Sequence, residues 1–72
     1  MKYIVSVAQE GQDGTVGALQ HAFDTEAEAR SAVYSEMASA YASGTLASDT
    51  VILFATNGYV LDTLHMQGAA RG

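Results

Sequence analysis

One stretch, residues 25–43, constrains the fold most, because it is the only segment long and periodic enough to form a substantial helix. It reads TEAEARSAVYSEMASAYAS. Thr25 followed by Glu28 fits a capping box, in which each side chain bonds the other residue's unpaired backbone N–H. Gly44 comes directly after the stretch and can adopt the left-handed conformation that ends a helix. The sequence therefore predicts one helix over residues 25–43.

The predicted helix has two distinct sides. At about 100° per residue, the side that should face a sheet carries Ala29, Val33, Tyr34, Met37, Ala40 and Tyr41. Serines recur at every fourth position on another side, at Ser31, Ser35, Ser39 and Ser43. A row of this kind is typical of a solvated helix face. The alternative is a contact with a second helix, since small side chains let two backbones approach closely.

Four short segments flank this helix and have the composition of strands. They are residues 3–8, 15–23, 50–56 and 59–66. Residues 10–14, EGQDG, predict a turn between the first two, and Asn57-Gly58 predicts a type I′ hairpin between the last two. Residues 45–49, TLASD, are interpreted as a polar connection. The sequence thus predicts an α+β domain over residues 1–66, in ββαββ order, with residues 67–72 as a flexible tail. We expect a four-stranded, mainly antiparallel sheet with the helix on one face.

The strand of residues 50–56, TVILFAT, is apolar on both faces, which is typical of a strand covered on both sides. One helix covers only one face of a sheet, and an exposed apolar face usually marks an interface. In addition, a chain of 72 residues buries only about 60% of its surface when it folds. We therefore expect a homodimer or higher homo-oligomer. Its predicted interface on the uncovered sheet face comprises Ile52, Phe54, Val60, Leu64 and Met66.

The charge of the chain limits its partners. The net charge is −5, with eight acidic residues against Lys2, Arg30 and Arg71. Three cations cannot form the basic patch that nucleic-acid binding needs, so direct binding of nucleic acid is not expected. The longest apolar runs are far shorter than the roughly 20 residues of a membrane span, and residues 1–10 do not form a signal peptide. These features favour a cytoplasmic protein.

No pattern in the sequence points to catalysis. The chain has no cysteine, and it lacks a nucleophile–base motif. His21 and His65 show no metal-ligand spacing, and Asp62 is the nearest carboxylate to His65 along the chain. Partly exposed strand histidines are the favoured interpretation. We expect no enzymatic activity, no catalytic or metal-binding residue and no cofactor.

Five helix residues are candidates for contact with a partner. Tyr34 and Tyr41 lie seven positions apart, and the favoured interpretation is that they pack at the sheet edge. Alternatively, aromatic rings at an oligomer seam stack a base or nucleotide, with Arg30 nearby for its phosphate. Ser35 and Ser39 belong to the serine row. The predicted partner-binding residues are Tyr34, Tyr41, Arg30, Ser35 and Ser39.

Three blocks carry a resemblance to a known group of proteins: MKYIVSVAQ, FDTEAEARSAVYSEMASAYASGTL and VILFATNGYVLD. Together they resemble short uncharacterised proteins of temperate bacteriophages and prophages. The resemblance covers nearly the whole chain but includes no catalytic motif. It implies a small binding protein that acts on a host protein or a nucleotide in the host cytoplasm, such as an anti-CRISPR-like inhibitor or a nucleotide-sequestering protein. The alternative is a structural or assembly protein whose role is self-association.

Overall fold

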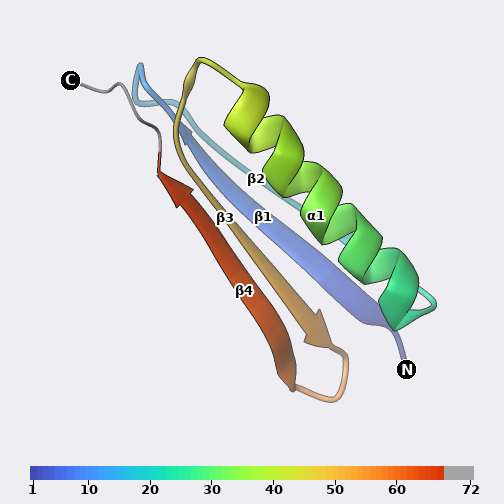
Figure 1. Ribbon diagram of the computed structural model, residues 1–72. Helices are drawn as coiled ribbons and strands as arrows, with labels where there is room; N and C mark the ends of the chain where they lie inside the picture. The colour runs from blue at the N-terminus through green and yellow to red at the C-terminus, as the bar shows by residue number, and fades with distance from the viewer. Residues whose placement is uncertain (68–72) are drawn as a thin grey trace.

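A computed structural model describes residues 1–67 and contains one helix and four strands (Figure 1). The elements are β1 (Tyr3–Gly11), β2 (Val16–Phe23), α1 (Glu26–Ala42), β3 (Leu46–Ala55) and β4 (Val60–Gln67). The sheet has the strand order β2-β1-β3-β4, and every neighbouring pair is antiparallel. The predicted ββαββ fold is therefore confirmed. Gln67, which was predicted to begin a flexible tail, is the last residue of β4, and the rest of that predicted tail lies outside the described residues.

Both hairpins turn in the same way. The Gly14 N–H donates to the Gly11 carbonyl at 3.0 Å, and the Gly58 N–H donates to the Ala55 carbonyl at 2.9 Å. Gly14 and Gly58 have φ angles of 91° and 99°, which favour glycine. The predicted type I′ turn at residues 57–58 is wrong, because that turn requires a positive φ at Asn57 as well, and Asn57 has none. Each loop is instead a tight turn followed by a left-handed glycine.

The Thr25 N-cap of α1 agrees with the prediction, whereas the reciprocal bond from the Thr25 backbone N–H to Glu28 and the end of the helix do not. The Thr25 hydroxyl caps the helix by accepting from the Glu28 backbone N–H at 3.2 Å. The same hydroxyl lies 3.1 Å from the Glu28 carboxylate, so the Glu28 side chain bonds the Thr25 side chain. At the other end, Ser43 is the C-cap, and its N–H bonds the carbonyls of Ser39 and Ala40. Gly44 does not take the left-handed conformation that was predicted for it.

The core lies between α1 and the two central strands. Ala29, Val33, Met37 and Ala40 are the buried residues of the helix, as the spacing predicts. They pack with Val5 and Val7 of β1, Val51 and Leu53 of β3, and Met66 of β4. Figure 1 shows the helix running along the strands on one side of the sheet.

The segment predicted as a polar connection, residues 45–49, is mostly strand. β3 already begins at Leu46 and pairs with the end of β1. Its side chains alternate regularly, so that Ala47 and Asp49 are buried while Ser48 and Thr50 are half-buried. A strand has this period of two whatever the polarity of its residues, and the prediction relied on polarity.

A β-bulge in β4 changes which residues share a face. Leu53 pairs with Asp62, but the next residue, Phe54, pairs with Val60, so Leu61 is an extra residue in β4. Val60 therefore lies on the uncovered face with Phe54. Leu64 pairs with Val51 and Met66 pairs with Asp49, which places both on the helix-covered face.

Candidate binding groove

The helix leaves part of its own side of the sheet open, over the edge strand β2. Val7 of β1 and Leu19 of β2 are register partners, so their side chains point to the same face. Val7 is 3% exposed, whereas Leu19 is 49% exposed. His21, the partner of Val5 on this face, is exposed as well. At Leu19 and His21 the cover provided by α1 therefore ends between β1 and β2, whereas Phe23 at the end of β2 packs against the core.

Three adjoining hollows follow this open strip and together form a groove over β1 and β2, and α1 lines the first of them. The first, of about 280 Å³, shares Val7 and Leu19 with the second, of about 180 Å³. The second shares Gln9 and Gly17 with the third, of about 460 Å³. The first hollow is lined by Val5, Val7, Leu19, His21, Phe23, Ala32, Ser35, Glu36 and Ser39. In this first hollow, apolar strand residues thus form most of the floor, beside His21, and the helix forms one wall.

The helix wall is built from small side chains. Ala32, Ser35 and Ser39 line it at helical spacing, together with Glu36. Ser35 and Ser39, both predicted partner-binding residues, therefore border the groove. The serine row lies beside an open strip of sheet, which allows a second element to approach the α1 backbone closely.

The carboxyl group of Asp49 is buried behind this wall, close to the Glu36 carboxylate. Asp49 of β3 is 0% exposed, and neither of its carboxyl oxygens makes a well-formed hydrogen bond. Its neighbour across the β1–β3 ladder is Gln9, whose Nε2 donates to Glu36 Oε2 at 2.8 Å. Burial, followed by the nearby Glu36 carboxylate, raises the pKa of Asp49 to about 6. An ionised Asp49 is thus disfavoured beneath the helix.

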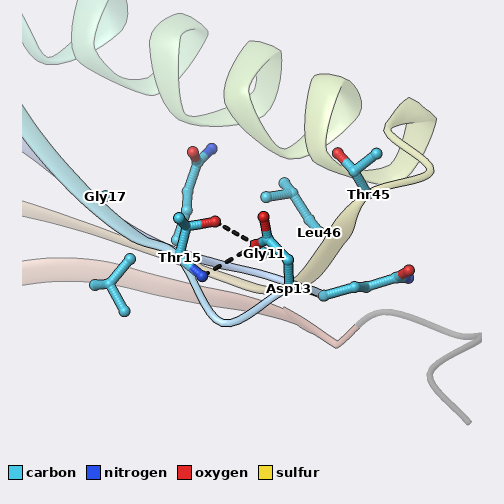
Figure 2. Close-up of a pocket in the computed structure, with 9 residues that line it drawn as sticks. Gly11, Asp13, Thr15, Gly17, Thr45 and Leu46 are labelled. Carbon is cyan, nitrogen blue, oxygen red and sulfur yellow. Dashed lines mark hydrogen bonds between the residues drawn. The ribbon is translucent and has the colours of Figure 1, made fainter.

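The wide end of the groove lies between the β1–β2 turn and the chain after α1 (Figure 2). Asp13 accepts from the Thr15 backbone N–H at 3.0 Å and also from the Thr15 hydroxyl. These hydrogen bonds lower the pKa of Asp13. The Gln12 N–H donates to the Thr45 carbonyl at 2.8 Å, which ties the turn to the start of β3. Asp13 therefore has a structural role in the β1–β2 turn. The bond between Gln12 and Thr45 fixes this turn as the rim of the wide end of the groove.

The other predicted partner-binding residues do not line the groove. Tyr34 and Tyr41 are 57% and 70% exposed, so the prediction that they pack at the sheet edge is wrong. They flank the buried stripe of α1, which is narrow because it rests on two central strands. Arg30 pairs with Glu26 at 2.8 Å and with Asp62 of β4 at 3.3 Å. The hydrogen bond that Arg30 donates to the Glu26 carboxylate raises the pKa of Arg30, which stays charged.

The residues predicted for the oligomer interface are divided between the two faces. Phe54 and Ile52 are half-buried on the uncovered face, where Val60 is 62% exposed and Ile4 pairs with Phe54. Leu64 and Met66 belong to the core side, so their predicted place beside Ile52 is wrong. The bulge at Leu61 is the reason. Away from this apolar end, the uncovered face carries small or polar residues such as Ser6, Ala18, Gln20, Thr50 and Thr63.

His65 lies on the opposite face of the sheet from His21 and Asp62. His65 lies opposite Thr50 on the uncovered face, and its Nδ1 is 2.8 Å from the Thr50 hydroxyl. Asp62 faces the helix side. Within residues 1–67, no group of three or more His, Asp and Glu side chains is placed to hold a metal ion.

Sequence reasoning missed the groove and its carboxyl pair. Leu19, Gln9 and Glu36 were not candidates, and Asp49 was placed in a loop. One signal was available, since the serine row already admitted a second helix as its neighbour.

In comparisons with protein-family models, with curated proteins and with solved structures, no match to this chain was found. In the described part of the chain, α1 is neither long nor apolar enough to cross a membrane.

Proposed function

We propose that this chain is a small, non-catalytic binding protein that holds a segment of a protein partner in the groove between α1 and β2. The observation that carries the proposal is the difference between Val7 and Leu19, which are neighbours on one face but 3% and 49% exposed. Apolar floor of this kind, left open beside a helix, is typical of a site that a partner covers. The resemblance to phage proteins supports a host component as the partner, in the host cytoplasm.

A protein segment suits the groove better than a nucleotide does. Glu36 stands in the wall, and a phosphate beside it would be repelled. Arg30 is bound in two ion pairs on the opposite side of the helix, toward β4. Among the two host-defence roles that the resemblance implies, an anti-CRISPR-like inhibitor is therefore better supported than a nucleotide-sequestering protein.

Site-specific photo-crosslinking tests this proposal. A photoreactive phenylalanine analogue replaces Leu19, in the groove, or Ala22, which belongs to the same strand but pairs with Ile4 on the opposite face. With a bacterial host lysate, we expect a discrete crosslinked species from position 19 and none from position 22. Crosslinks from position 22 alone, or from neither position, would contradict a groove-binding function.

Self-association is the second candidate function, as in a structural or assembly protein. It is favoured by the apolar cluster of Ile4, Ile52, Phe54 and Val60 at one end of the uncovered face. Size-exclusion chromatography with light scattering tests it. An oligomer that dissociates in the variant Val60→Asp would support this role, whereas a monomer at high protein concentration would exclude it.

A further inference from the structure

We propose that the groove recognises a basic amphipathic helix of a foreign protein, with one Lys or Arg side chain of that helix paired to Glu36. This inference rests on the proposed function and names the chemistry of the partner. Its premises are the shape of the groove, the charges that line it, and the buried carboxyl group behind Glu36.

The shape of the groove favours a helix. Neighbouring helices on a sheet pack about 8–10 Å apart, and the closer spacings need small side chains at the contact. Ala32, Ser35 and Ser39 supply such a wall, while Leu19 and Phe23 supply apolar floor beside it. An added strand would instead pair with the outer edge of β2 and leave the exposed face of Leu19 uncovered. A helix lying beside α1 covers that face.

The charges favour a basic foreign segment over a second copy of this chain as the occupant. Glu36 is the one formally charged side chain that lines the first two hollows. Within residues 1–67 the cationic side chains are Lys2, which pairs with Asp24, and Arg30, which pairs with Glu26 and Asp62. Both are already engaged in ion pairs within their own chain. The net charge of −5 also repels copies and attracts a basic segment.

Asp49 gives this recognition a second feature. It is fully buried with unpartnered carboxyl oxygens, and the ionisable group that faces it is Glu36 of α1. Its ladder neighbours, Gln9 on β1 and Met66 on β4, are uncharged. A cation held at Glu36 offsets the negative charge that keeps Asp49 protonated. Binding of the basic helix should therefore release a proton near pH 6.

The probe is a pair of synthetic amphipathic peptides of about 14 residues, roughly 21 Å long as helices. They are identical except at one central position, which is Lys in one peptide and the uncharged norleucine in the other. Backbone amide shifts in NMR spectra report the binding site and the affinity. We expect both peptides to shift Val7 and Leu19, with the Lys peptide binding about fivefold more tightly.

Three variants of the protein make the test specific. Glu36→Gln should erase the difference between the peptides, and Ser39→Lys, which brings the chain's own cation to Glu36, should do the same. Glu10→Gln removes an equal charge from the uncovered face and should preserve the difference. Circular dichroism of each variant confirms that it folds.

The outcomes separate this inference from the proposed function. If both peptides bind wild-type protein equally, or if Glu36→Gln keeps the difference, the basic partner is wrong and a groove-binding function stands. Failure of both peptides to bind overturns the helical partner, while the crosslink at position 19 still decides the function. Release of a proton with the Lys peptide but not with norleucine, measured by calorimetry in buffers of different ionisation enthalpy, supports the pairing. Equal release with both contradicts it.

Discussion

Replacement of Asp49 by Asn should remove a loss of stability that the wild-type protein suffers as the pH rises. Asp49 is 0% exposed, and its pKa is raised from 3.8 to about 6, chiefly by burial and then by Glu36. Between these two values the folded protein keeps a proton that the unfolded chain has lost. The free energy of unfolding therefore falls as the pH rises from about 4 to about 6, and the loss is complete above that range.

The size of this effect follows from the two pKa values. The difference between 3.8 and about 6 is about two pH units. At about 1.4 kcal/mol per unit, the wild-type protein should lose about 3 kcal/mol of stability across this range. The amide side chain of the Asp49→Asn variant would carry no charge and would contribute no such slope. Asp13 and Asp24 have lowered pKa values, so their contributions have the opposite sign, arise at lower pH and are the same in both proteins.

Urea unfolding followed by circular dichroism, at several pH values between about 4 and about 8, measures the effect. We expect the stability curves of Asp49→Asn and wild type to diverge with rising pH, in favour of the variant. Glu10→Gln, a neutralised acid on the uncovered face, is the control and should follow the wild type. Parallel curves for Asp49→Asn and wild type would refute the account of a buried, proton-bearing Asp49.

Five further substitutions test the packing, turn and cap of the fold. Leu53→Ala should cost about 2–5 kcal/mol because Leu53 is 1% exposed in the core, and Leu19→Ala in the open groove should cost far less; equal losses by urea unfolding would contradict an open groove. Gly58→Ala should lower stability by about 1–2 kcal/mol because its φ is 99°. Gly44→Ala, which has open space and no positive φ, is the control and should cause no loss; thermal unfolding measures both variants. Thr25→Ala removes the N-cap and should cost about 1 kcal/mol, and an unchanged melting temperature would argue against the cap.

The sequence predicts the helix, the ββαββ order of elements along the chain and most of the core, because these depend on local periodicity. Val33 and Met37 are buried at helical spacing, and Val51 and Leu53 at strand spacing. The errors arise where distant contacts decide the outcome. Asp49 is polar, yet pairing with β1 makes it a strand residue with a buried side chain.

The bulge at Leu61 and the groove were beyond local reasoning for a similar reason. A single extra residue in β4 places Leu64 and Met66 on the opposite face from Val60, and no pattern within the strand indicates it. The groove depends on where α1 rests across the width of the sheet, which is set by packing against Val7 and its neighbours. The sequence offered Ser35 and Ser39 as small residues of the helix, but not the strip of β2 beside them.

The strand order β2-β1-β3-β4 also divides the protein into two local hairpins that share one distant seam. Each hairpin closes over a turn of a few residues, whereas the residues that pair across β1 and β3 lie between 46 − 11 = 35 positions (Gly11 and Leu46) and 55 − 3 = 52 positions (Tyr3 and Ala55) apart along the chain. Closing so long a loop costs more chain entropy than closing either turn. We expect the seam to form last, as α1 docks over it, so that Val7 and Val51 control the folding rate more strongly than residues of either turn do.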